Sequence, residues 1–92
     1  MEKLIRVEKI VIDTKIGNQY QVILTNPSGK NSSHLKYRPF EGVLIQETLD
    51  HLTLRSNNGG YCESFLKKDF AIKYYVIKEK INGRWSQLQV KY

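Results

Sequence analysis

The side chains that could carry out covalent or metal chemistry are few: Cys62, His34 and His51. Their spacing matches no zinc-binding pattern, and neither histidine belongs to a nucleophile signature. Cys62 falls within a predicted strand, where we expect a buried and unreactive thiol. The sequence contains no glycine-rich phosphate loop and no paired carboxylates. We therefore expect a protein that is not an enzyme, with no metal site and no cofactor.

Cationic and aromatic side chains form a second group, and they occur side by side. Tyr37 lies between Lys36 and Arg38, and Trp85 follows Arg84. Single-stranded nucleic acid binds through phosphate neutralisation and base stacking, and stacking contributes about 1–3 kcal/mol per base. The residues expected to contact nucleic acid are Lys30, Lys36, Tyr37, Arg38, Phe40, Lys67, Lys68, Lys73, Tyr75, Arg84 and Trp85.

These residue types also have a purely structural interpretation. Lysines on edge strands protect a sheet against aggregation, which would account for Lys73, Lys78, Lys80 and Lys91. Large aromatic side chains can also fill a small core with their polar tips at the surface. This interpretation applies to Tyr20, Tyr61, Tyr74 and Trp85. Neighbours on a strand point to opposite faces, so we expect one of Tyr74 and Tyr75 in the core and the other at the surface.

Charge is distributed unevenly along the 92 residues, whose formal net charge is +6. Residues 30–40 carry three cations and no acid, residues 41–64 carry one cation and four acids, and residues 65–92 carry seven cations and two acids. The length fits a single domain, residues 1–92. The single cysteine fits a reducing compartment, and no apolar run has the length of a signal peptide or a membrane span. We expect a cytoplasmic protein without a membrane partner.

Two-residue alternation of apolar residues dominates the chain and predicts strands. We expect them over residues 4–12, 20–25, 40–47, 51–56, 61–66, 71–80 and 85–92. The turn-forming residues 15–18 would join the first two strands in a hairpin, and residues 57–60 and 82–83 would form two further hairpin turns. Residues 67–70 would form a short link or one turn of 3₁₀ helix. Residues 26–39 would form a long basic loop.

About seven short strands with regular turns predict an all-β barrel or small sandwich. The segments 40–45, 50–55 and 63–70 resemble the strand pattern of Sm-like proteins, with Gly42 in a strongly bent second strand and Asp50 before the third. SH3-like barrels share much of this pattern of strands and turns. The resemblance implies a single SH3-like or Sm-like barrel of about five to seven antiparallel strands. The long basic loop and a C-terminal hairpin would be additions to it.

The chain also departs from the Sm-like pattern. A strand is expected over 3–12 where that family begins with a helix, and Phe65–Asp69 lacks the histidine of the bacterial RNA chaperone's signature. Ring assembly and uridine binding are therefore not carried over.

The expected function is a non-enzymatic module that binds single-stranded RNA or DNA through residues 30–40 and the C-terminal hairpin. The alternative is a protein-interaction or adaptor module, or a homo-oligomer, that pairs an outer strand (3–12 or 84–92) with a partner.

Overall fold

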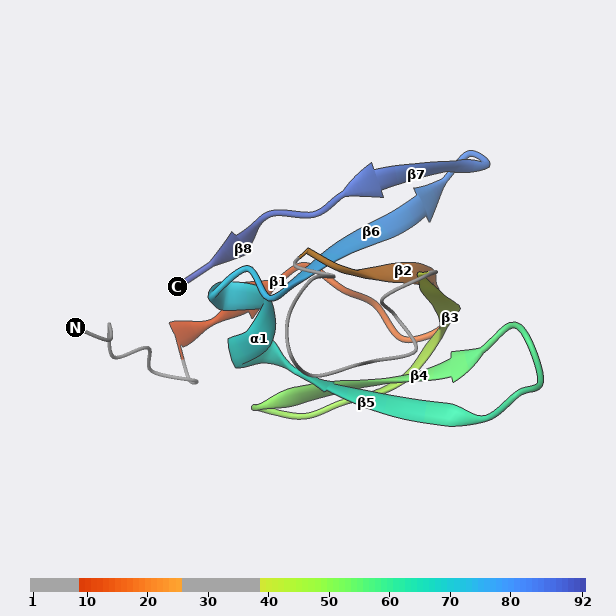
Figure 1. Ribbon diagram of the computed structural model, residues 1–92, viewed down its shortest axis with the longest axis horizontal. Coiled ribbons are helices and arrows are strands. Elements are labelled where there is room, and N and C mark those ends of the chain that lie inside the picture. Colours follow the sequence, from red (N-terminus) through yellow and green to blue (C-terminus); the bar gives the residue numbers. More distant parts are fainter. Residues whose placement is uncertain (1–8, 26–38) are drawn as a thin grey trace.

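The computed structural model describes residues 9–25 and 39–92, and this part of the chain is mostly antiparallel β-sheet (Figure 1). The helix α1 is a short one, Lys67–Ala71. The strands are β1 (Val11–Ile12), β2 (Gln19–Leu24), β3 (Phe40–Glu47), β4 (His51–Ser56), β5 (Cys62–Leu66), β6 (Tyr75–Ile81), β7 (Arg84–Gln87) and β8 (Val90–Lys91). The all-β expectation is confirmed.

Six strands form one sheet in the order β5-β4-β3-β2-β6-β7, and β1 pairs with β8. The predicted hairpin between the first two strands is therefore wrong. Both edges of β2 are occupied, by β3 and by β6. The pair β1–β8 instead places Ile12 opposite Val90, and Ile10 and Ile12 are buried in the core.

Strand bounds and turns follow the sequence closely in the middle of the chain. The bounds predicted for β3 and β4 are confirmed, and residues 57–60 connect β4 to β5 with Gly59 and Gly60 at positive φ. β6 begins only at Tyr75, because α1 and the turn after it occupy residues 67–74. The single strand predicted over 85–92 is divided into β7 and β8.

The sheet is strongly curled. Four strand spacings separate β5 from β6 in the sheet order, which would be about 19 Å in a flat sheet. The ring of Phe65 on β5 nevertheless packs edge-on against the ring of Tyr75 on β6, with 5.5 Å between centroids. A register shift between Leu44 and Gln46 of β3 provides a bulge of the kind that bends a strand. The inner face of the curl holds the core: Ile10, Ile12, Tyr20, Val22, Leu24, Phe40, Leu44, Leu52, Leu54, Phe65, Phe70, Ala71 and Ile77.

Gly42 on β3 is a point of close backbone approach. A Cβ atom at this position would lie 2.2 Å from the carbonyl oxygen of Arg55 on β4. Only glycine therefore fits here without moving the backbone. The register shift that marks a bulge in β3 lies a little further along the strand, between Leu44 and Gln46.

Candidate functional site

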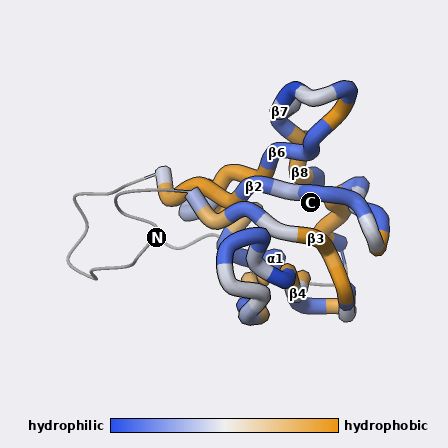
Figure 2. Tube along the Cα trace, turned by 90° about the vertical axis from the view of Figure 1, so that its right-hand side faces the viewer, coloured by the Kyte–Doolittle hydropathy of each residue, from blue (hydrophilic) through white to orange (hydrophobic). Residues whose placement is uncertain are grey.

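The hairpin β6–β7 extends beyond the rest of the sheet. Its turn consists of Asn82 and Gly83, both at positive φ (52° and 80°), as a two-residue turn between twisted strands requires. The pairing of β6 with β2 ends at Glu79, whereas its pairing with β7 continues to Ile81. Figure 2 shows the hairpin standing away from the other elements. Its tip is therefore accessible from several sides.

One face of this hairpin combines cations with an indole ring. Lys80 is the cross-strand partner of Trp85, and Lys78 is the partner of Gln87, so these four side chains share a face. We call it the basic face. The ammonium of Lys80 lies 5.6 Å from the centroid of the half-buried Trp85 ring, within the range of a cation–π interaction. A cation and a stacking surface thus meet on the protruding hairpin.

The acidic residue of the hairpin, Glu79, does not lie on the basic face. Glu79 lies on the opposite face, where its Oε2 accepts hydrogen bonds from Asn18 Nδ2 at 2.9 Å and from the Tyr20 hydroxyl at 2.8 Å. Burial, together with the nearby Glu79 carboxylate, raises the pKa of Tyr20 to about 12. This network fixes β6 to β2 and keeps the carboxylate away from Lys78 and Lys80.

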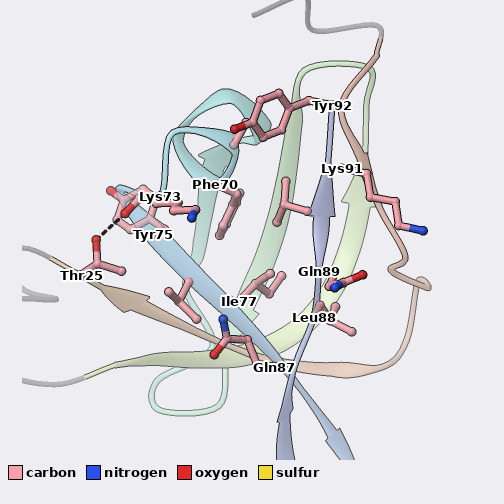
Figure 3. A pocket seen from close by; sticks show the side chains of 13 residues that line it. Thr25, Phe70, Lys73, Tyr75, Ile77, Gln87, Leu88, Gln89, Lys91 and Tyr92 are labelled. Atoms are coloured by element: carbon pink, nitrogen blue, oxygen red, sulfur yellow. Dashed lines mark hydrogen bonds between the residues drawn. The ribbon is translucent and has the colours of Figure 1, made fainter. Parts of the chain in front are cut away.

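A groove adjoins the hairpin at the other end of β6. The chain after β7 leaves β6 at Leu88, whose amide donates a last hydrogen bond to the Ile77 carbonyl at 3.0 Å. The two segments then diverge around a pocket of about 900 Å³ (Figure 3). Phe70 and Ile77, both part of the buried core, reach into it. Lys73, Tyr75, Lys91 and Tyr92 also line it.

Lys73 occupies the position that usually holds glycine at the end of a helix. Its φ is 65°, its amide donates to the Phe70 carbonyl at 3.1 Å, and the Tyr74 amide donates to the Asp69 carbonyl at 2.8 Å. This is the Schellman arrangement, in which glycine avoids the steric cost of a left-handed residue. The Thr25 hydroxyl donates to the Lys73 carbonyl (Figure 3). A lysine is thus held in an unfavourable conformation at the rim of the groove.

Several predicted contact residues take other roles or fall outside the described residues. Lys30, Lys36, Tyr37 and Arg38 fall outside them. Phe40 is only 3% exposed and packs against the rings of Tyr61 and Phe65, so it cannot stack on a base. Lys67 is 7% exposed, with its Nζ 2.9 Å from Glu47 Oε2. We therefore remove Phe40 and Lys67 from the expected contact set.

The remaining predicted residues are distributed over the surface. Trp85 lies on the basic face, whereas the exposed Arg84 lies on the other face of the hairpin, opposite Ile81. Lys73 and Tyr75 line the groove, and Lys68 is exposed on α1. These residues therefore do not form one continuous site.

The expectation for Tyr74 and Tyr75 is wrong. Both side chains are half-buried, and their ring centroids lie 4.8 Å apart. The reason is that Tyr74 precedes β6, in the turn after α1, so the alternation of a strand does not apply to the pair.

Lys78 and Lys80 are not among the predicted contact residues, because lysines at such positions are expected on ordinary edge strands. A signal for them was present, because a two-residue turn at Asn82-Gly83 fixes the pairs 81–84, 80–85 and 78–87 by counting outward. That count places Lys80 beside Trp85. The groove had no such local signal, because it depends on where the last segment separates from β6.

The potential nucleophile and metal ligands stay apart. Cys62 is exposed at the start of β5, so the expectation of a buried thiol is wrong. The Nδ1 of His51 lies 2.8 Å from Asp50 Oδ1 and 2.9 Å from Thr48 Oγ1, within the turn between β3 and β4. Hydrogen bonds from Thr48 and then His51 lower the pKa of Asp50. Within residues 9–25 and 39–92, no three histidine, cysteine or acidic side chains are grouped closely enough to hold a metal ion.

Comparison of the chain with models of protein families, with curated proteins and with solved structures found no match. In the part of the chain that the structure describes, no helix has the length and apolar character needed to cross a membrane.

Proposed function

We propose that this chain is a non-enzymatic module that binds single-stranded nucleic acid through the basic face of the β6–β7 hairpin. The observation that carries the proposal is the pairing of Lys80 with Trp85 on a hairpin that projects from the sheet. Phosphate neutralisation by lysine and stacking on an aromatic ring are the two components of sequence-tolerant single-strand binding.

The distribution of charge supports this proposal. Residues 65–92 carry seven cations and two acids, and one of those acids, Glu79, is bonded to Asn18 and Tyr20 on the opposite face of the hairpin. Residues 30–40 add three cations and Tyr37 as a second expected contact region. An approaching polyanion would thus meet Lys78 and Lys80 without an intervening carboxylate on the basic face.

We further propose that the curled sheet is a small barrel of the SH3-like or Sm-like kind. The aromatic contacts that span its interior support this: Phe65 packs against Phe40, Phe70 and Tyr75 at centroid distances of 5.4, 6.4 and 5.5 Å. These rings come from β3, β5, α1 and β6, so elements at distant places in the sheet order share one core. A barrel would hold the hairpin at a fixed angle to the core.

The test is binding of fluorescein-labelled dT15 and U15 oligonucleotides, measured by anisotropy from low to high salt. Replacing Lys78 and Lys80 by alanine should reduce the slope of log K against log salt by about 1.4, since each lost phosphate contact on a single strand contributes about 0.7. Trp85→Ala should weaken binding by about 5- to 150-fold through lost stacking.

The matched control removes two exposed lysines from another part of the molecule, Lys9→Ala with Lys15→Ala. Both double variants lose the same net charge, so a general charge effect would lower the salt slope equally in both. Equal slopes would contradict the placement of the site on the hairpin. A wild-type protein that binds neither oligonucleotide at low salt would contradict nucleic-acid binding itself.

A further inference from the structure

Tyr75 is a residue of β6 whose peptide groups face the groove. The N–H and C=O of one strand residue point to the same side, and the side alternates along the strand. Ile77 accepts the hydrogen bond from Leu88, so its peptide groups point toward the C-terminal segment, and those of Tyr75, two residues earlier, point the same way. The pairing between β6 and β7 begins only at Lys78. In the part of the chain that is described, Tyr75 therefore has no strand partner on this side.

The walls of the groove suit an apolar side chain. Phe70 and Ile77 belong to the core, and the half-buried Leu88 and Val90 pack against it from the C-terminal segment. In Figure 3 these elements diverge as a V that is open between β6 and the segment leading to Tyr92. An added strand would direct every second side chain to the same face, about 6.6 Å apart, so one or two of them could cover this surface.

The charged side chains that line the groove are cations, although the Asp69 and Glu63 carboxylates lie near enough to act on the Tyr75 phenol. The lining includes Lys73 and Lys91 and no aspartate or glutamate side chain. Lys73 is the residue held at positive φ in a glycine position. A strained conformation kept where the fold would accept glycine suggests that the side chain has a use. A carboxylate on the ligand would complement this ammonium.

We propose that the groove binds an extended peptide segment of another protein, which adds a strand to β6 at Tyr75. The segment would place an aliphatic side chain over Phe70 and Ile77 and an acidic residue beside Lys73. Strand addition obtains affinity from main-chain hydrogen bonds and specificity from alternate side chains. The mostly apolar lining and the outward-facing peptide groups of Tyr75 favour a peptide over a nucleic acid here. The groove adjoins the basic face at Gln87, which belongs to both, but Lys78, Lys80 and Trp85 do not line the groove, so the two proposals can fail independently.

The experiment uses an array of blocked heptapeptides with valine or isoleucine at alternate positions and aspartate or glutamate at either end. The best binder is then titrated against the full chain by anisotropy, and amide chemical shifts in ¹⁵N-labelled protein map its site. We expect shifts centred on Tyr75, Val76 and residues 88–91. Replacing the terminal acids by lysine should weaken binding at least five-fold. Methylating the backbone nitrogens that face β6 should weaken it at least ten-fold, because the strand hydrogen bonds are lost.

The protein variant that tests the site is Lys73→Gly, which keeps the backbone conformation and removes the ammonium. It should weaken binding of the acidic peptide at least five-fold and should not weaken binding of the lysine-ended peptide, which loses a repulsion. The matched control is Asn82→Gly, which also replaces a residue at positive φ but lies at the hairpin tip. This control and the Lys78→Ala, Lys80→Ala double variant should leave peptide binding unchanged.

Four results would overturn the proposal. The first is an array without binders, and the second is binding that is insensitive to both N-methylation and Lys73→Gly. The third is displacement of the peptide from residues 88–91 by the dT15 oligonucleotide, which would make nucleic acid the occupant. The fourth is a dependence of the groove's amide shifts on protein concentration without peptide, which would identify a second copy of the chain as the occupant.

Discussion

The strands β2–β5 and the strands β6–β8 are built differently. In the first group, which we call the closed half, β2, β3, β4 and β5 follow one another in sheet order, and Val22, Leu44, Leu52 and Leu54 are fully buried. We call the second group the open half. Here β7 pairs with β6, the chain separates from β6 at Leu88, and β8 then pairs with β1. Residues 41–64 are net acidic, with one cation and four acids, whereas residues 65–92 are net basic. The closed half thus supplies many of the buried apolar side chains that stabilise the fold. The open half carries lysines, aromatic rings and a groove that remain accessible to a ligand.

The largest expected effect tests the closed half. Gly42→Val should lower the free energy of unfolding by more than about 4 kcal/mol, because the new Cβ would overlap the Arg55 carbonyl on the neighbouring strand. Urea unfolding followed by circular dichroism measures the loss. The control, Ser86→Val, adds the same side chain at an exposed position of β7 and should change stability by less than about 0.5 kcal/mol. A stable Gly42→Val protein would contradict the close approach of β3 and β4.

The second prediction concerns the Tyr20–Glu79 hydrogen bond that joins the two halves. The fold raises the pKa of Tyr20 from 10.0 to about 12, so the neutral phenol is favoured in the folded state. The neutral Tyr20 phenol contributes fully to the free energy of unfolding below pH 10. This contribution is lost as the pH rises to 12, and the free energy of unfolding then falls by up to about 1.4 kcal/mol per pH unit. Unfolding measured from pH 9 to 12 should therefore show a steeper loss for the wild type than for Tyr20→Phe. Equal slopes would show that Tyr20 ionises alike in both states.

A smaller effect is expected at the ion pair between the buried Lys67 and the more exposed Glu47, which anchors α1 to β3. Glu47→Gln should cost about 2 kcal/mol, because it leaves the buried ammonium without a counter-charge. Lys67→Met should cost less, since it removes the buried charge and leaves a more exposed carboxylate. Thermal unfolding of both variants at pH 7 gives the comparison. A larger loss of stability for Lys67→Met than for Glu47→Gln would contradict the expectation that the buried ammonium needs its partner more than the carboxylate does.

The smallest effect is a gain, and it tests the open half. Lys73→Gly should raise the free energy of unfolding by about 1 kcal/mol, because glycine adopts the positive φ at the end of α1 without steric cost. Urea midpoints at constant m-value measure the gain. Asn82→Gly should be nearly neutral, since asparagine tolerates the left-handed region. A loss of stability in Lys73→Gly would mean that its side chain supports the fold rather than a ligand.

The features of this protein that its sequence alone predicts are local ones, such as strand positions and turns. Alternation of apolar residues placed β3 and β4, and the Asn-Gly pairs placed two hairpin turns, because side-chain direction and positive φ are properties of a few consecutive residues. Charge segregation was equally visible, since it requires only counting. Even the Lys80–Trp85 pair follows from the turn at Asn82-Gly83.

Tertiary structure alone decided which distant segments meet. Residues 11–12 pair with 90–91 instead of forming a hairpin with β2, and the same pairing draws the C-terminal segment away from β6 and opens the groove. Phe40 and Lys67 are buried, Phe40 in the core itself, because the sheet curls until β3, β5 and α1 surround one interior. Such contacts depend on the summed burial of apolar surface across the whole chain, and no short window of sequence contains that information.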